Sequence, residues 1–441
     1  MKKQNIFLSI TDGFAERMLL KTDFLKFLKD KCNVVVFIPD HGQQKKEFIS
    51  EPLVKYQPSG LAGFLHWYVR GFMYENFKKN ETLTIKLKNM KKTNLLKYLI
   101  IQTLLLLTRI KPIRKMILYL NYFLIPEFYK VFFEKYNPAL VICSSGGIKA
   151  DDLPLIKSAK KRKILTIGII QSWDNLTSKG YINPKQDKFI VWNDIMKEEL
   201  TLFHGVDEKD IFVSGPIHYD FFFSSVSKDD FIHKYNIPSY NKVILITSSP
   251  EWTYQHFEWI VENILKAIDE KKIRYPAKVI LRLHPNDPPQ RYEKIKNENL
   301  IINLPAIYEK NMGWIQEKEH IEDFISLLKF SDVVVCVSST ITIDAACFDT
   351  PVINIAFDRD NLQYELSCRR YYDYAHYKNI VKTGGVRISY NLQELIDYIN
   401  LYLEDKNLDR EGRKRIVLQQ CKFIDGKSAE RAAKYILSFM E

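Results

Sequence analysis

Short apolar runs rich in valine and isoleucine recur along this chain, and helical patterns separate them. Near-continuous apolar runs of this kind are typical of parallel strands covered by helices on both faces. The first series comprises residues 6–10, 34–38, 140–143, 164–170 and 188–192. The second series comprises residues 211–213, 243–247, 278–283, 300–303, 333–337 and 351–355. Two series predict an α/β protein with two Rossmann-like domains that face each other across a cleft.

The domain limits follow from the length and from breaks in this periodicity. A chain of 441 residues is too long for one hydrophobic core, so two domains are expected. We place the first domain at residues 1–225, with a largely helical, basic insertion at about residues 60–136. Residues 226–390 are assigned to the second domain. Residues 391–441 are predicted to be helices that pack back on the first domain.

The insertion carries much of the formal net charge of +12, and acidic residues are nearly absent between residues 78 and 115. A basic surface suits anionic lipid headgroups, phosphorylated acceptors or nucleic acid. Nucleic acid is not expected, because no zinc-finger, KH or RRM signature accompanies the charge. Lysines and arginines break the apolar stretches into pieces shorter than the ~20 residues that span a bilayer. Peripheral contact with a membrane surface and ordinary helix packing remain the two interpretations.

Cysteine usage and the first residues bear on the compartment. The six cysteines show no CxxC or Cys/His spacing, and Cys143 and Cys336 fall within strand-like runs, so free thiols are expected. Residues 1–5 lead directly into a strand, without the apolar region of a signal peptide. We therefore expect a cytoplasmic location, with the inner face of the cell membrane as the more specific alternative.

Polar residues that follow predicted strands of the first domain are candidates for acceptor binding, because doubly wound sheets bind ligands at the carboxyl ends of their strands. Asp12 and Gly13 precede a helix predicted at residues 14–28, whose N-terminus can attract an anionic group. The alternative is that Asp12 only caps this helix. A second turn of small residues at 144–147 either holds phosphate or links a strand to a helix.

The segment 171–180 gathers polar, aromatic and basic residues behind another strand. Burial beside the indole of Trp173 would raise the pKa of Asp174, which suits a general base. Asn175, Thr177 and Lys179 are placed to orient an acceptor hydroxyl or phosphate, and Trp173 is also a candidate acceptor contact. A solvated loop with a capping aspartate is the alternative.

Two segments of the second domain are candidates for donor binding. Pro285 restricts the backbone of His284 at the end of a strand, so this imidazole is projected in a defined direction, with Arg282 beside it. As a catalytic residue, His284 could donate to a phosphoryl oxygen or protonate a leaving group. Ser338, Ser339 and Thr340 follow another strand and begin a helix, where hydroxyls and backbone N–H groups together bind phosphate without a metal. The alternatives are that His284 is a structural histidine and that the segment from Ser338 to Thr340 only caps its helix.

Five motifs occur in a fixed order along the chain. They are residues 171–174, Gly215 and Pro216 with Asp220, residues 249–252, His284 with Pro285, and Ser338 and Ser339 with Asp344. This order resembles the GT-B transferases of the CDP-glycerol glycerophosphotransferase and capsule-polymerase type, over roughly residues 171–355. The His-Pro and Ser-Ser pairs also resemble bacterial sialyltransferases and Kdo transferases, which use CMP-activated sugars.

The resemblance implies roles for individual positions. It makes His284, Ser338 and Ser339 contacts of the donor phosphate or nucleotide, and it places Gly215 on the donor side. Asp174 stands where the glycerophosphotransferases have the histidine of a Trp-His-Gly motif that acts as base. Ile217 stands where an arginine usually follows the proline. These departures favour a sugar donor, CMP-linked among others, over CDP-glycerol.

The sequence thus predicts a metal-independent GT-B glycosyltransferase that needs no cofactor. It would move a sugar from a nucleotide-activated donor to a cell-surface polysaccharide or a lipid-linked glycan. The alternatives are polyol-phosphate transfer from CDP-glycerol or CDP-ribitol, a nucleotide-sugar 2-epimerase, and a membrane-bound scaffold without activity. The letters of a DxD motif at Asp358 and Asp360 are assigned to a loop rather than to a metal site.

Overall fold

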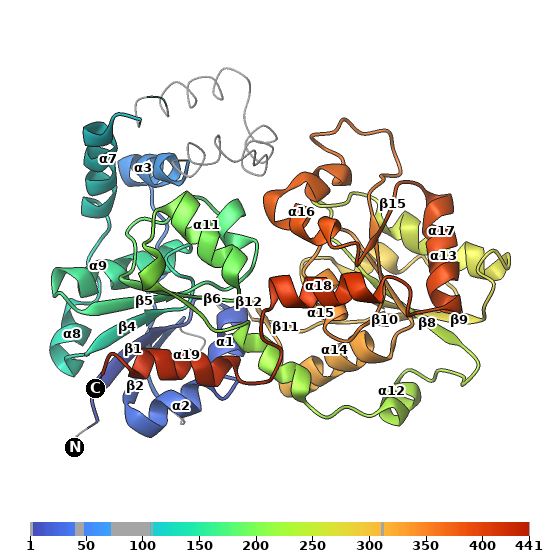
Figure 1. Cartoon of the computed structure of the whole chain (residues 1–441), viewed down its shortest axis with the longest axis horizontal. Helices are drawn as coiled ribbons and strands as arrows, with labels where there is room; N and C mark the ends of the chain where they lie inside the picture. Colours follow the sequence, from blue (N-terminus) through green and yellow to red (C-terminus); the bar gives the residue numbers. More distant parts are fainter. Residues whose placement is uncertain (1–2, 40–47, 72–105, 107–108, 310–312, 441) are drawn as a thin grey trace. The chain divides into compact units, whose positions relative to one another are not determined.

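The computed structural model describes residues 3–39, 48–71, 106, 109–309 and 313–440 (Figure 1). The chain forms two compact units. The first comprises Met1–Phe223, Tyr308–Ile315 and Cys421–Glu441, and the second comprises Ser224–Ile307 and Gln316–Gln420. Each unit is built around one sheet of parallel strands with helices on both faces, as the apolar runs predict.

The sheet of the first unit has seven strands in the order β3-β2-β1-β4-β5-β6-β7, and every pairing is parallel. The strands are β1 (Asn5–Ser9), β2 (Asn33–Ile38), β3 (Ile49–Pro52), β4 (Leu140–Cys143), β5 (Leu165–Ile169), β6 (Lys188–Val191) and β7 (Ile211–Val213). Successive side chains of β1 point to opposite faces of the sheet and join different hydrophobic clusters. Ile6 and Leu8 belong to one cluster, and Phe7 belongs to another. Cys143 is a buried free thiol in β4, as expected.

The helices of this unit are α1 (Gly13–Leu19), α2 (Phe24–Lys31), α3 (Gly60–Arg70), α7 (Lys111–Phe123), α8 (Lys130–Tyr136), α9 (Leu153–Lys161), α10 (Asn175–Ser178), α11 (Asp194–His204) and α19 (Ser428–Leu437). The single helix predicted at residues 14–28 is in fact α1 and α2. The hydroxyl of Thr22 donates to the Met18 carbonyl and accepts the Phe24 N–H, so a side chain replaces backbone hydrogen bonds between the two helices.

The sheet of the second unit has six parallel strands in the order β10-β9-β8-β13-β14-β15. They are β8 (Lys242–Thr247), β9 (Ala277–Arg282), β10 (Leu300–Asn303), β13 (Val333–Cys336), β14 (Val352–Ile355) and β15 (Arg387–Ser389). The helices are α12 (Lys228–Lys234), α13 (Phe257–Asp269), α14 (Lys318–Phe330), α15 (Ile341–Ala346), α16 (Ala375–Lys382), α17 (Leu392–Glu404) and α18 (Arg410–Gln420). Two further short strands, β11 (Ile307–Glu309) and β12 (Gly313–Ile315), form a separate two-stranded sheet.

The structure differs from the predicted organisation of strands and domains in two places. Residues 211–213 were assigned to the second series, but they form β7 and pair with β6 in the first sheet. The helices of residues 391–441 do not act as one block, because α17 and α18 belong to the second unit and only residues from Cys421 onward join the first. Leu395 and Ile399 of α17 lie in the apolar core of the second sheet, which holds this helix there.

The docking of α19 on the first unit explains one of the motifs. A Cβ atom at Gly215, whose φ is +86°, would lie 2.5 Å from the hydroxyl of Ser428. Asp220 accepts the N–H groups of Ser428 and Ala429, at 3.0 and 2.7 Å, and so caps α19. The contacts of Gly215 are therefore with the C-terminal helix, and this glycine is needed for packing rather than for the donor contact expected of it.

Candidate functional site

The carboxyl ends of β8, β9 and β13 form the candidate donor site in the second unit. The sheet order places β8 between the other two strands, so Ser248, His284 and Ser338 follow three neighbouring strands at one edge of the sheet. The backbone N–H of His284 donates to the hydroxyl of Ser248 at 2.9 Å, which ties the first two segments together. This edge is where doubly wound sheets bind ligands.

The imidazole of His284 is held in one orientation. Its Nδ1 accepts the backbone N–H of Asn286 at 3.0 Å, so the proton of the neutral ring is on Nε2. Burial lowers the pKa of His284, although the nearby carboxylate of Asp287 opposes this shift. His284 is therefore a neutral hydrogen-bond donor at pH 7, which suits contact with a phosphate oxygen better than protonation of a leaving group.

Ser338, Ser339 and Thr340 lie half-buried in the turn between β13 and α15. Ser339 Oγ accepts the N–H of Ile341 at 3.3 Å, so this hydroxyl satisfies the first N–H group of α15. Below the turn, the hydroxyl of Thr342 lies 2.8 Å from the hydroxyl of Tyr377 in α16. These two buried hydroxyls hold the turn in place, so Ser338, Ser339 and Thr340 stay together beside the ends of β8 and β9.

Arg282 does not belong to this site. Its guanidinium is buried, donates to Asn303 Oδ1 at 2.6 Å and lies 3.8 Å from Asp323 Oδ2. It also lies over the ring of Phe324, 4.8 Å from the centroid. Arg282 therefore joins β9, β10 and α14, and the donor-binding role expected of it is not supported by its contacts.

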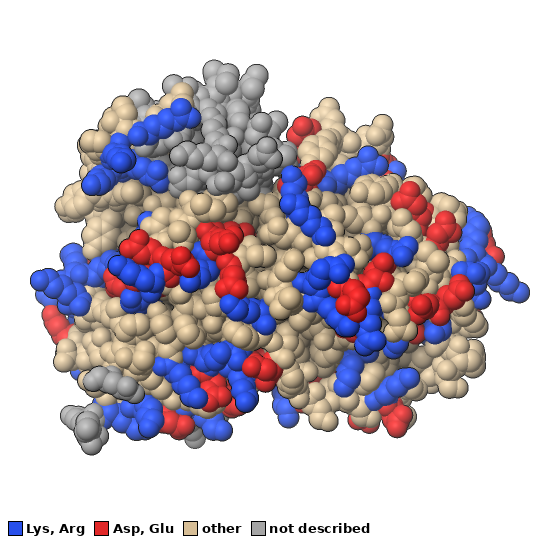
Figure 2. All heavy atoms as spheres, in the orientation of Figure 1, with Lys and Arg blue, Asp and Glu red and all other residues tan. Residues whose placement is uncertain are grey.

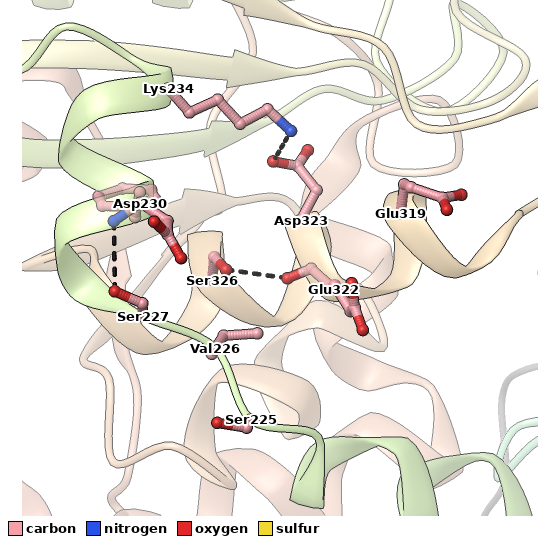
Figure 3. Close-up of a pocket in the computed structure, with 10 residues that line it drawn as sticks. Ser225, Val226, Ser227, Asp230, Lys234, Glu319, Glu322, Asp323 and Ser326 are labelled. Carbon is pink, nitrogen blue, oxygen red and sulfur yellow. Dashed lines mark hydrogen bonds and ion pairs between the residues drawn. The ribbon is translucent and has the colours of Figure 1, made fainter.

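The same network borders a pocket of about 270 Å³ between α12 and α14 (Figure 3). Lys234 of α12 pairs with Asp323 of α14 at 2.5 Å across it. The other charged residues that line it are Asp230, Glu319 and Glu322. Four carboxylates against one ammonium group would repel a phosphate, so this pocket is not a donor site.

A glycine pair and an aspartate pair of the second unit have structural contacts. Gly385, which follows Gly384 in the turn before β15, packs directly against the backbone of Gly412 in α18, so this turn serves helix packing. Asp358 accepts the hydroxyl of Ser367 at 2.5 Å, whereas Asp360 pairs with Arg359 at 2.9 Å. In the described ranges no three His, Cys, Asp or Glu side chains are grouped to hold a metal ion.

In the first unit, the segment after β5 forms the short helix α10. Trp173 and Asn175 are buried, Asp174 is half-buried and Lys179 is exposed. Ser178 Oγ donates to Asp174 Oδ2 at 2.8 Å, so the carboxylate is held at the start of α10. The structure places Trp173, Asp174 and Asn175 in one compact turn.

Two residues of the insertion contact this segment and were not anticipated from the sequence. Arg70, at the end of α3, donates from Nε to the Lys179 carbonyl at 2.7 Å, and its own carbonyl accepts the N–H of Tyr181. His66 lies one turn earlier, 3.5 Å from Arg70. Burial and then the positive charge of Arg70 lower the pKa of His66 to about 4. A pairing of residues about 110 positions apart leaves no local pattern in the sequence.

Helix α11 contributes a second unanticipated pair. His204 Nδ1 accepts the N–H of Ile182 at 3.3 Å, which leaves Nε2 to donate to the Leu176 carbonyl at 2.9 Å. Glu199 is buried on the same helix, and its Oε2 has no hydrogen-bond partner. Burial, and then the negative charges of Asp174 and Glu198, raise the pKa of Glu199 well above its ordinary value.

Asp12 and Gly13 are used inside the first unit. Asp12 Oδ1 accepts the N–H of Ala15 at 2.8 Å, and its other oxygen pairs with Lys149. A Cβ atom at Gly13 would overlap the carbonyl oxygen of Trp314 in β12, so glycine is needed for this packing. Helix capping and close packing thus account for both residues without an acceptor.

No helix in the described part of the chain is both long enough and apolar enough to cross a membrane.

Comparisons with known proteins agree with this architecture. The fold is similar to a UDP-GlcNAc 2-epimerase from Neisseria meningitidis bound to UDP-GlcNAc, with a TM-score of 0.54 and 13% identity over 99% of this chain and 100% of that chain. A glycosyltransferase from Rickettsia africae ESF-5 gives a TM-score of 0.53 and 12% identity over the whole of both chains. The wall teichoic acid polymerase TagF with CDPG gives 0.52 and 11%, over 99% of this chain and 88% of that chain. No curated protein matches the sequence.

These neighbours establish the fold as GT-B, which confirms the predicted fold class. Sequence comparison adds the family. The model for CDP-Glycerol:Poly(glycerophosphate) glycerophosphotransferase matches residues 169–438, more than half of the chain and a span that includes the segment after β5 and the edge formed by β8, β9 and β13. The resemblance drawn from the motif order is thereby confirmed, and the chain belongs to the CDP-Glycerol:Poly(glycerophosphate) glycerophosphotransferase family.

Proposed function

We propose that this enzyme transfers a sugar from a nucleotide-activated donor to a cell-surface polysaccharide or a lipid-linked glycan. The main support for a nucleotide-activated donor is the fixed imidazole of His284. Its Nε2–H is available beside the turn of Ser338, Ser339 and Thr340. A neutral donor and a set of hydroxyls suit the phosphate of a nucleotide, because they stabilise its charge without a bound cation. Of the fold neighbours, the Neisseria meningitidis epimerase is bound to UDP-GlcNAc and TagF was soaked with CDPG, which supports a nucleotide donor here.

In the proposed reaction Asp174 removes the proton from the acceptor hydroxyl. The acceptor oxygen then forms a bond to the anomeric carbon, and the bond between that carbon and the donor phosphate oxygen breaks. The departing nucleotide carries the extra negative charge, which His284 and the Ser338 turn stabilise. The hydrogen bond from Ser178 keeps Asp174 in place for this step. No step requires a metal ion or a cofactor.

The second candidate is transfer of a polyol phosphate from CDP-glycerol or CDP-ribitol, which the family match favours. Here the acceptor oxygen forms a bond to the phosphorus of the polyol phosphate, and CMP leaves. The substitutions that favour a sugar are Asp174, at the position of the family's histidine, and Ile217, at the position of its arginine.

A donor panel decides between these functions. The full chain is incubated with an oligosaccharide acceptor and with CMP-sugars, UDP-sugars, CDP-glycerol or CDP-ribitol in turn, and the product is analysed by mass spectrometry. A product that gains a sugar and no phosphorus supports the leading proposal, whereas a product that gains phosphorus supports the second. Interconversion of free UDP-GlcNAc without an acceptor would point to a 2-epimerase and contradict both.

We further propose that the enzyme works in the cytoplasm at the inner face of a cell membrane, where such acceptors are assembled. The basic composition of the insertion supports this location. The description of the family, which names a poly(glycerophosphate), supports an acceptor of the cell envelope.

A further inference from the structure

Arg369 lies in the short helix η5 (Cys368–Asp373), which follows β14 in the second unit. Its Nε donates to the carbonyl oxygen of Ala356 at 3.0 Å, and Ala356 is the first residue after β14. Because β14 pairs with β13 and Ser338 follows β13, the guanidinium lies at the same edge of the sheet as the candidate donor site. Arg369 is exposed, so its two outer nitrogens can reach a ligand.

Hydrogen bonds also fix the backbone of Arg369 at this edge. Asp358 accepts the hydroxyl of Ser367 at 2.5 Å and the backbone N–H of Cys368 at 3.2 Å. Ser367 Oγ in turn accepts the backbone N–H of Arg369 at 3.1 Å. The place of Arg369 therefore does not depend only on the bond from its own Nε.

Tyr372 connects η5 to the turn that begins at Ser338. Its hydroxyl donates to the carbonyl of Ile355, the last residue of β14, at 2.7 Å. Burial raises the pKa of Tyr372, and the backbone N–H of Ser338, which faces the phenol oxygen, opposes this shift. One phenol thus contacts both the end of β14 and the Ser338 turn, and Arg369 lies one helical turn before it.

The charge of Arg369 is not balanced by an acidic partner. Among the residues that the structure describes, no aspartate or glutamate forms an ion pair with it. Other arginines of the second unit do form such pairs, among them Arg274, Arg291, Arg359, Arg387, Arg410 and Arg413. On the face of the second unit that Figure 2 draws, acidic side chains likewise lie among the basic ones. The neighbouring Arg370 is buried against the ring of Tyr371, so Arg369 is the one of this pair that can bind an anion.

The other groups of the candidate donor site carry no positive charge. His284 is neutral at pH 7 because burial lowers its pKa, and the turn from Ser338 to Thr340 offers hydroxyls. In the proposed reaction the departing nucleotide has one more negative charge than the nucleotide part of the intact donor. Hydrogen bonds between charged groups are about twice as strong as neutral ones, and an arginine can donate two of them to a phosphate. A cation at this edge would therefore favour departure.

We infer that Arg369 is a further phosphate-binding residue of the donor site, whose outer guanidinium nitrogens contact a phosphate of the nucleotide while Nε stays on the Ala356 carbonyl. The same contact stabilises the charge of the nucleotide as it leaves. This second role rests on the proposed function, whereas the binding of phosphate does not.

Calorimetric titration of the full chain with inorganic pyrophosphate, and with CMP, CDP, UDP and GDP, tests the inference. The test variants are Arg369→Gln, which removes the charge, and Arg369→Lys, which keeps it. The control is Arg274→Gln. The Arg274 side chain is 56% exposed and pairs with Glu404, and the residue precedes β9, so it lies at the opposite edge of the same sheet.

Arg369→Gln should bind pyrophosphate about tenfold to a hundredfold more weakly than the native chain does. The loss should be similar for the nucleotides, because the contact is with phosphate and not with the base. Arg369→Lys should recover part of the affinity, and Arg274→Gln should bind as the native chain does. Melting temperatures show whether each variant is folded.

The inference is overturned if Arg369→Gln binds as tightly as the native chain, or if the native chain binds neither pyrophosphate nor any nucleotide. It is also overturned if Arg369→Lys binds as weakly as Arg369→Gln and both variants melt at lower temperature, because arginine would then be needed only for its bond to Ala356.

A transfer assay separates this inference from the proposed function. With a donor identified by the panel, Arg369→Gln should lower kcat by about a hundredfold, as removal of one oxyanion donor does. An unchanged kcat would contradict the role of Arg369 in departure. Binding of pyrophosphate that depends on Arg369, together with no transfer from any donor, would contradict only the proposed function.

Discussion

Replacement of Glu199 by glutamine should change how the stability of the protein depends on pH. The carboxyl group is buried on α11, one of its oxygens has no partner, and the charges of Asp174 and Glu198 oppose its ionisation. Its pKa in the folded protein is therefore raised, while in the unfolded chain it is ordinary. Between these two pKa values the folded state binds one more proton than the unfolded state. The stability supplied by this proton is complete below the unfolded pKa and is lost as the pH rises towards the folded one.

The size of the effect follows from proton linkage. One proton taken up on folding gives a slope of at most about 1.4 kcal/mol per pH unit. For a unit of this size the slope corresponds to about 3 °C in Tm per pH unit. Glutamine keeps the shape of the side chain and carries no charge, so Glu199→Gln should lack this slope. Its advantage over the native chain should grow from about pH 5 to pH 8.

Thermal denaturation of the native chain and of Glu199→Gln at intervals between pH 4.5 and pH 8 measures the difference. The neighbouring Glu198 is exposed, and Glu198→Gln is the matched control, because it removes the same charge from the same helix without burial. The control should follow the native curve. Parallel curves for the native chain and Glu199→Gln would show that Glu199 is ionised in the folded protein and would refute this reasoning.

Two other substitutions test the structural roles assigned above. Asp220→Ala removes the cap of α19 and should lower stability by about 0.5–2 kcal/mol, with a smaller loss for Asp220→Asn; an unchanged Tm in Asp220→Ala would contradict the assigned cap. Arg282→Lys should destabilise the second unit by about 1–3 kcal/mol, because its hydrogen bond to Asn303 and its contact with Phe324 are lost. The nucleotide affinity of Arg282→Lys, measured below its unfolding temperature, should stay close to that of the native chain. A loss of affinity without loss of stability would show that Arg282 belongs to the donor site.

The strands were predictable where burial on both faces leaves a continuous apolar run. β4, β7 and β10 have the predicted limits, and the other predicted strands differ by one residue at one end or at both ends. β3 and β15 were missed because Glu51, Pro52 and Arg387 interrupt their short sequences at the edges of the sheets. Assignment of β7 to a sheet depends on its pairing with β6, and strand pairing is not encoded in apolar periodicity.

The candidate site was predictable where a residue follows a strand, because chain order alone then brings it to the edge of the sheet. His284 and Ser338 are examples. Residues whose roles depend on distant partners were not predictable. Arg282 looks like a neighbour of His284 in the sequence but points to Asp323 in the structure. Glu199 joins the segment after β5 through the packing of α11 on α10.

We propose above that a nucleotide-activated donor binds at the edge formed by β8, β9 and β13. Calorimetric titration of the full chain with CMP, CDP, UDP and GDP, repeated with His284→Ala, tests it most directly. His233 is exposed on α12, and His233→Ala is the matched control. At least one nucleotide should bind the native chain and the control equally and should bind His284→Ala about tenfold more weakly, as expected for one hydrogen bond to a charged group. Equal affinity in His284→Ala, or no binding of any nucleotide by the native chain, would contradict the account.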